Sequence, residues 1–245
     1  MRIGGFIDAS TKDWPKKVVA VIFTVGCNFN CKFCQNKPLL EPSAGEDLTI
    51  DSILDRLKNN FLIDGVSITG GEPMLQKDLI QVCEEISKLD MLVSVDTNGS
   101  KPEVIEKLLP YINRIALDLK VPLDSDEKRA REIINANIIP QKIRKSIELV
   151  QHSKNTQFEI RTTYVKKLHI PSDLIDIMNY LKNINFPGDY VVQQYQYSDG
   201  VGEKYMEMFE EPTFEEIKDI ITSYTSKIPF NVFARARGIG YKKLI

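Results

Sequence analysis

Residues 18–34 read VVAVIFTVGCNFNCKFC, and this stretch carries the two signals that decide the fold class. Its first part, 18–25, is an apolar run rich in β-branched residues, which is typical of a buried strand. Three cysteines follow at once, Cys27, Cys31 and Cys34, with three and then two residues between them. Because active sites in α/β folds lie at the carboxyl ends of the strands, the cysteine loop is placed where chemistry would occur.

Alternating strand and helix patterns around this stretch predict the rest of the fold. Further strands are expected from short apolar runs at 65–70, 91–97, 114–121, 157–165, 190–197 and 228–234. Helices are expected where apolar residues recur at three- and four-residue spacing, at 49–62, 76–89, 102–109, 143–153, 172–183 and 213–226. About six such repeats imply parallel pairing, and a full barrel needs eight. We therefore predict an α/β fold: a partial, open TIM-type barrel with about six βα units. The charged, weakly periodic segment 122–141 predicts a surface excursion.

Composition and charge exclude several classes of protein. The chain has 245 residues, 42% of them hydrophobic, with 32 basic and 34 acidic residues that give a formal charge of −2. These values favour one globular domain, and a net charge near zero provides no electrostatic attraction for tight binding of nucleic acid. The longest apolar run falls short of the roughly 18 residues of a membrane span, and the N-terminus lacks the pattern of a signal peptide. We therefore expect a cytoplasmic protein without a membrane partner.

The cysteine spacing favours an iron–sulfur cluster. Three thiolates on one short loop can hold three corners of a [4Fe–4S] cube, which leaves the fourth iron open to a substrate or cofactor. A zinc site of three cysteines and one histidine is an alternative, for which the chain offers only His152 and His169, and three unliganded thiols are another. Cys83 lies within a predicted apolar helix face, where core packing is favoured over a role as fourth ligand.

On these residues the sequence resembles the radical S-adenosylmethionine (SAM) superfamily. The matching signature is Cys27, Cys31 and Cys34 with an aromatic residue, Phe33, before the last cysteine. The resemblance implies one [4Fe–4S] cluster whose unique iron is chelated by the amino and carboxylate groups of SAM. It also implies reductive cleavage of SAM to methionine and a 5′-deoxyadenosyl radical, with Phe33 packed near the cluster and the adenine.

A second motif, Thr69-Gly70-Gly71-Glu72-Pro73, follows the second predicted strand. The two glycines allow backbone groups to approach a neighbour closely, and Glu72 offers a carboxylate to an ammonium group. In isolation this motif is more typical of a turn. In the superfamily the equivalent segment holds the SAM amino group, so the resemblance assigns cofactor binding to Gly70, Gly71 and Glu72.

Polar residues also end the next two predicted strands. Asp96-Thr97-Asn98-Gly99 ends one, and Asp118-Leu119-Lys120 ends the other. If these strands pair in sequence order, both carboxylates and the lysine face one cavity; a solvated strand end with an Asn-Gly turn is the alternative.

Together the two segments resemble glycyl-radical-enzyme activating enzymes. This comparison implies a monovalent cation near Asp96, Thr97 and Asp118, with the Leu119 carbonyl as a further ligand. Asn98 belongs to the same cofactor-binding segment. Lys120 and Arg161 would lie near the SAM carboxylate or sulfonium, although Arg161 could instead form an ordinary ion pair. The implied catalytic set is the three cysteines together with Lys120.

The N-terminal phrase resembles the branch that activates anaerobic ribonucleotide reductase. Gly5-Phe6-Ile7-Asp8, Asp13-Trp14-Pro15 and the strand that leads into the cysteine loop carry this match. It implies a single radical SAM domain over 1–245, with an N-terminal extension at 1–16 and a more variable part from about 190 to 245. Between Pro38 and Asp47 there is no cysteine-rich insertion, so an auxiliary ferredoxin-like cluster domain is not expected.

The resemblance also implies partners and leaves two rival functions. The substrate would be a glycine of a glycyl radical enzyme, with flavodoxin or ferredoxin as electron donor in an anaerobic setting. One rival is a radical SAM enzyme acting on a small molecule or nucleoside, of the deazapurine or tRNA-modification type. The other is a non-enzymatic iron–sulfur or zinc protein.

Overall fold

The computed structural model describes residues 1–41, 43–137, 139–198, 200–201, 205 and 207–245. Its strands, in chain order, are β1 (Arg2–Ser10), β2 (Val19–Thr24), β3 (Glu46–Asp47), β4 (Gly65–Gly70), β5 (Leu92–Thr97), β6 (Arg114–Asp118), β7 (Gln157–Tyr164), β8 (Asp189–Gln194), β9 (Asn231–Ala236) and β10 (Gly240–Lys243). The α-helices are α1 (Ile50–Lys58), α2 (Leu79–Ser87), α3 (Pro102–Leu108), α4 (Glu127–Ile134), α5 (Pro140–Gln151), α6 (Pro171–Asn183) and α7 (Phe214–Thr222). Short 3-10 turns are η1 (Lys37–Leu40), η2 (Pro73–Leu75) and η3 (Leu109–Tyr111).

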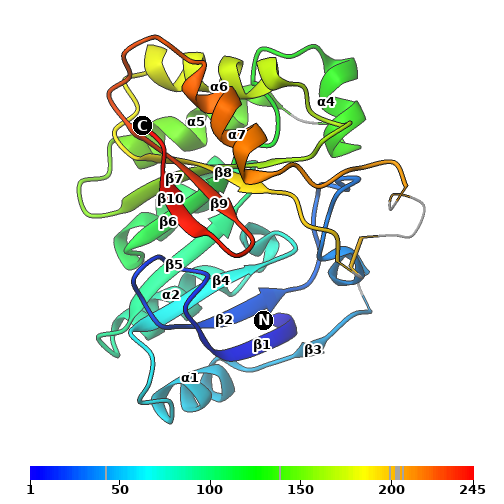
Figure 1. Ribbon diagram of the computed structural model, residues 1–245. Coiled ribbons are helices and arrows are strands. Elements are labelled where there is room, and N and C mark those ends of the chain that lie inside the picture. Colours follow the sequence, from blue (N-terminus) through cyan, green and yellow to red (C-terminus); the bar gives the residue numbers. More distant parts are fainter. Residues whose placement is uncertain (42, 138, 199, 202–204, 206) are drawn as a thin grey trace.

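The described strands form one open sheet in the order β10-β9-β8-β7-β6-β5-β4-β2-β1-β3. Neighbouring strands from β2 to β9 pair in parallel, whereas β1, β3 and β10 pair antiparallel at the two edges. Figure 1 shows the sheet curving round with its helices along the outer side. The prediction of an open α/β barrel with about six βα units is confirmed, because six helical connections join seven parallel strands.

The main core lies between the outer face of the sheet and the helices. Alternate strand residues such as Ile68, Val95 and Leu117 are fully buried against helix residues such as Leu79 and Ile105. Fully burying one such side chain contributes about 1.5–3 kcal/mol, so this layer supplies most of the driving force for folding. The opposite, inner face of the same strands carries polar residues, which are Ser67, Ser94, Asp96, Arg114, Glu159 and Arg161.

Capping residues fix the starts of two helices. The Thr49 side chain accepts a hydrogen bond from the Ser52 amide at the start of α1. At the start of α7, Thr213 and Glu216 form a reciprocal capping box. Such caps satisfy amide groups that the first turn leaves without helical partners.

The structure corrects two expectations about the edges of the fold. Segment 122–141 is not a surface excursion, because it contains α4, whose Ala130, Ile133 and Ile134 are buried against the cysteine loop. Four of its charged residues, Glu127, Lys128, Arg131 and Glu132, are exposed, and three apolar positions in eight residues are too few for the periodicity to stand out. The N-terminal segment 1–16 contributes β1 to the sheet. The last predicted strand begins at Asn231 rather than 228, and β10 follows it in a hairpin.

No helix in the described part of the chain is both long and apolar enough to span a bilayer.

Candidate active site

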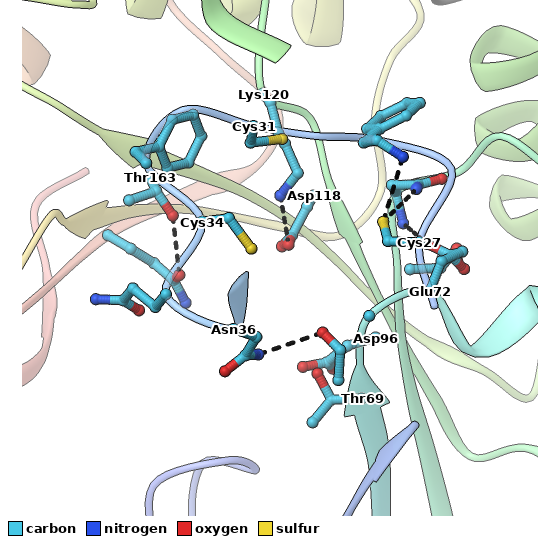
Figure 2. Close-up of a pocket in the computed structure, with 18 residues that line it drawn as sticks. Cys27, Cys31, Cys34, Asn36, Thr69, Glu72, Asp96, Asp118, Lys120 and Thr163 are labelled. Carbon is cyan, nitrogen blue, oxygen red and sulfur yellow. Dashed lines mark hydrogen bonds and ion pairs between the residues drawn. The ribbon is translucent and has the colours of Figure 1, made fainter. Parts of the chain in front are cut away.

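The three cysteines lie on the loop that follows β2, at the carboxyl end of the parallel sheet. Cys31 is buried, while Cys27 and Cys34 are partly exposed. Figure 2 shows all three sulfur atoms spread around one pocket. The pocket is lined by Cys27, Phe29, Cys31, Phe33, Cys34, Gln35, Asn36, Thr69, Gly70, Gly71, Glu72, Asp96, Thr97, Asn98, Asp118, Lys120, Thr163 and Gln193. Every predicted site residue except Leu119 and Arg161 therefore lines this cavity, and the Leu119 carbonyl instead accepts a hydrogen bond from Thr162 Oγ1 at 2.7 Å.

The Gly70–Gly71 pair fits the end of β4 tightly against the start of the cysteine loop. The Gly71 amide donates to the Thr24 carbonyl at 2.8 Å, and the Glu72 amide donates to the Gly26 carbonyl at 2.7 Å. A Cβ atom on Gly71 would overlap the Gly26 carbonyl oxygen, and one on Gly70, at φ +117°, would overlap the Thr24 backbone. The glycines thus permit a close approach of two backbone segments, which fixes the cysteine loop relative to β4.

Hydrogen bonds and burial define the surroundings of the Cys27 and Cys31 thiols. The Phe29 amide donates to Cys27 Sγ at 3.4 Å, and the Asn98 side-chain amide lies 3.9 Å from the same sulfur. Burial raises the pKa of Cys27 to about 11 and that of Cys31 to about 12. Both are therefore thiols at neutral pH in the metal-free chain, and positively charged iron would stabilise the thiolate forms.

The two histidines do not complete a mononuclear zinc site with the cysteines. Within the described residues, no group of three or more His, Cys, Asp or Glu side chains is arranged to hold a single metal ion. A zinc ion needs all its ligands within about 2.0–2.3 Å of one point, whereas a cube of irons spans a larger space. His169 uses both ring nitrogens in hydrogen bonds, and His152 lies elsewhere on the surface at the end of α5. The zinc alternative therefore has no histidine to complete it.

Cys83 is separate from this site. It is fully buried in α2 and belongs to the main hydrophobic core together with Val82 and Ile86. The prediction of core packing is confirmed.

Glu72 ties the end of β4 to the end of β5. Its Oε1 accepts hydrogen bonds from Thr97 Oγ1 at 2.7 Å and from the Met74 amide at 3.1 Å. Its Oε2 accepts one from the Asn98 amide at 2.7 Å. Burial raises the pKa of Glu72 to about 7 against the opposing effect of these hydrogen bonds. The carboxylate therefore already has three donors, and any ligand contact from it would be additional to this bracing role.

Arg161 forms ion pairs with both Asp96 and Asp118. The guanidinium lies 3.0 Å from Asp96 Oδ2 and 2.9 Å from Asp118 Oδ1. Lys120 Nζ lies 2.9 Å from the other oxygen of Asp118. Burial alone would raise the pKa of Asp118, but the charges of Arg161 and Lys120 outweigh it and hold that pKa near 2. Because β5, β6 and β7 pair in sequence order, these carboxylates do face one cavity, as predicted.

The same geometry bears on two alternatives left open by the sequence. Arg161 forms ion pairs beneath the pocket and does not line it. Asp96, Thr97 and Asn98 are at most 8% exposed, so a solvated strand end does not describe them. Asp96 Oδ1 is buried without a hydrogen-bond partner, and Arg114 Nη1 lies 3.7 Å from it.

A buried charged chain continues from Asp96 along the inner face, and the sequence reasoning missed it. Arg114 Nη2 lies 2.9 Å from Glu159 Oε1, and Glu159 Oε2 accepts a hydrogen bond of 2.7 Å from the Tyr241 hydroxyl. Charged residues at alternate positions of two predicted strands were the available signal. The pocket residues Asn36, Thr163 and Gln193 were also missed, because no local motif marks them, and Thr69 was quoted in its motif without a role.

These residues fit a [4Fe–4S] cluster with SAM. Three thiols on one loop can supply three ligands to such a cluster, which would leave one corner open. The rest of the wall is polar and charged, and an aromatic ring, Phe33, stands beside the thiols. A zwitterionic ligand with an adenine group matches that lining.

Comparison with known proteins agrees with this geometry. The family model described as the radical SAM superfamily matches residues 21–211. A "putative glycyl-radical enzyme activating enzyme" of Methanocaldococcus jannaschii is 35% identical over 233 residues, which covers 92% of this chain and 94% of that protein. The pyruvate formate-lyase 1-activating enzyme of Escherichia coli strain K12 is 22% identical over 251 residues, covering 94% of this chain and 98% of that protein.

A solved structure shows the same fold. The Streptococcus suis SuiB structure with the precursor peptide SuiA matches with a TM-score of 0.63 at 20% identity. The match covers 89% of this chain but only 48% of the SuiB chain, so this chain spans about half of that structure.

Proposed function

Because the chain belongs to the radical SAM superfamily, we propose that it activates a glycyl radical enzyme, and that this partner is the anaerobic ribonucleotide reductase of its host. Membership in the superfamily implies a [4Fe–4S] cluster and SAM. When bound, these groups supply reductive cleavage of SAM to methionine and a 5′-deoxyadenosyl radical, which abstracts hydrogen. The observation that carries the proposal is the 35% identity over nearly the full length of both chains to the M. jannaschii protein.

In this proposal the cysteine loop holds the cluster and its neighbours hold SAM. Cys27, Cys31 and Cys34 would ligate the cluster, and Phe33 would pack beside it. The Gly70–Gly71–Glu72 segment and Asn98 bound the pocket where the SAM amino group would bind. Lys120, held by Asp118 at 2.9 Å, supplies positive charge for the SAM carboxylate.

A monovalent cation near Asp96, Thr97 and Asp118 is part of the proposal. The buried Asp96 Oδ1 without a hydrogen-bond partner supports it, because an orphaned carboxylate oxygen is a ready ligand for a hard cation. Arg161 neutralises one oxygen of each carboxylate and thereby limits the charge that the cation would meet.

The open sheet gives a protein substrate a way in. The described sheet has edges at β3 and β10 and is not closed into a barrel (Figure 1). In this proposal a partner's loop would enter at the open side of the sheet. The surrounding wall would exclude water and other hydrogen donors from the radical. Flavodoxin or ferredoxin would deliver the electron.

Electron paramagnetic resonance (EPR) tests this function. The reconstituted protein is mixed anaerobically with SAM, a reductant and the host's anaerobic ribonucleotide reductase. We expect a glycyl-radical doublet that requires every component and that is lost with the Cys31→Ser variant. Accumulation of 5′-deoxyadenosine without a doublet would reject this partner and favour a small-molecule or nucleoside substrate.

A further inference from the structure

His169 occupies a buried position behind the pocket. It lies in the loop between β7 and α6 and is 4% exposed. Its backbone amide donates to the Val165 carbonyl at 2.8 Å, and its Nδ1 faces the Val165 amide at 3.1 Å. Since an amide is only a donor, Nδ1 accepts this bond and the ring proton resides on Nε2.

The other ring nitrogen contacts the backbone of Lys120. His169 Nε2 lies 3.0 Å from the Lys120 carbonyl oxygen, which is only an acceptor, so Nε2–H donates. The same tautomer therefore satisfies both bonds. Together they tie the loop after β7 to the backbone of Lys120, which follows the end of β6. The side chain of Lys120 lines the pocket.

The His169 ring also supports Phe33. The two rings meet edge to face, with centroids 5.8 Å apart. Lys120 Nζ in turn lies 5.9 Å from the Phe33 ring centroid. One imidazole thus contacts both the backbone of Lys120 and the aromatic side chain that stands between two of the cysteines.

The surroundings keep this ring neutral. Burial lowers the pKa of His169, and Arg129 acts in the same direction. The nearby carboxylate of Asp173 is engaged by the Arg129 guanidinium and by the Ile170 amide. A neutral imidazole is required for Nδ1 to accept from Val165.

We propose that His169 is a positioning residue that sets Lys120 and Phe33 relative to each other for SAM binding. It does not line the pocket and so acts through these two residues. The inference rests on the SAM site of the proposed function, but not on the identity of the partner. Removing a residue that orients metal ligands typically costs about 10- to 100-fold in affinity or activity, and we expect a loss of the same order where the oriented residues bind SAM.

Two variants separate hydrogen bonding from packing. His169→Phe keeps an aromatic ring and removes both hydrogen bonds, whereas His169→Gln keeps a donor and an acceptor. Formation of 5′-deoxyadenosine is measured without any partner protein, as a function of SAM concentration. We expect His169→Phe to raise KM for SAM about 10- to 100-fold with a smaller change in kcat, and His169→Gln to recover most of the loss.

A second readout uses the cluster-free chain. It contains only two histidines, so nitrogen NMR of the imidazoles is readily assigned with the exposed control His152→Gln. We expect His169 to show the Nε2–H tautomer at neutral pH. The Val165 amide should exchange slowly in the wild type and in His169→Gln, and faster in His169→Phe.

Three results would overturn the inference: an unchanged KM in His169→Phe, an Nδ1–H or charged imidazole, or equal losses in both variants without rescue. A missing glycyl radical with the expected KM pattern would instead reject only the proposed partner. If the wild type fails to cleave SAM, the proposed function fails, while the NMR and exchange results still report on the geometry of His169.

Discussion

The buried ion pair between Arg114 and Glu159 gives the sharpest test of how the inner face is stabilised. Arg114 is 1% exposed, and its side chain lies 2.9 Å from Glu159. Among the residues that the structure describes, replacing Arg114 with Met leaves the Glu159 carboxylate with only the Tyr241 hydroxyl as a donor. Asp96 keeps Arg161 at 3.0 Å, so the uncompensated charge falls mainly on Glu159.

Breaking a buried pair from one side costs about 3–5 kcal/mol, because a charge remains without its partner. For a chain of this size that loss lowers the unfolding midpoint by about 6–20 °C, at about 2–4 °C for each kcal/mol. Glu159→Gln should destabilise the wild type but stabilise the Arg114→Met variant, since it removes the orphaned charge. The two substitutions should be coupled by about 2 kcal/mol.

The assay is denaturant unfolding of the cluster-free chain, followed by two spectroscopic probes. The free energies of unfolding of the variants are compared where their m-values are equal. Arg131→Met is the matched control, because its pair with Glu127 is exposed and should contribute less than about 1 kcal/mol. If Glu159→Gln further destabilised Arg114→Met, or if the free energies simply added, the buried-pair reasoning would be refuted.

Three further predictions concern the site. Gly71→Ala should lower iron content after anaerobic reconstitution and cost about 1–3 kcal/mol in stability, because its Cβ meets the Gly26 carbonyl, whereas Gly5→Ala, with ordinary contacts, should change neither. Cys31→Ser should abolish SAM cleavage, while circular dichroism shows a folded chain. Cys83→Ala should keep its iron content and lose about 1 kcal/mol or more of stability. Retained SAM cleavage in Cys31→Ser together with lost iron in Cys83→Ala would contradict the ligand assignment. Burial raises the pKa of Glu72 from 4.5 to about 7. The folded chain therefore holds that proton more tightly than the unfolded chain, so stability should fall by about 3 kcal/mol from pH 4.5 to 7 and level off above. A Glu72→Gln chain should lack this component, and equal pH profiles for the two chains would count against it.

Local motifs explain why much of the site could be predicted from the sequence. The cysteine loop and the Gly70–Gly71 pair are contiguous, and their residue types are demanded by chemistry and by close backbone packing. The order of the strands then placed Asp96 and Asp118 at neighbouring strand ends. The strand–helix alternation also predicted the open sheet.

Other features depend on contacts that no local pattern encodes. The Arg114–Glu159 pair joins residues 45 positions apart, and Tyr241 reaches Glu159 across 82 positions. The α4 helix is short and highly charged, so its packing against the cysteine loop emerges only in the folded chain. His169 was considered only as a zinc ligand, and its two hydrogen bonds could not be foreseen from its neighbours in sequence.

Isotope transfer tests whether the proposed enzyme takes hydrogen from a glycine of a partner protein. The host's anaerobic ribonucleotide reductase is prepared with glycine deuterated at Cα and incubated anaerobically with the reconstituted protein, SAM and reductant. We expect deuterium in the 5′-deoxyadenosine product, detected by mass spectrometry, together with a glycyl radical on the partner. Deoxyadenosine that forms in the same amount without deuterium would contradict it.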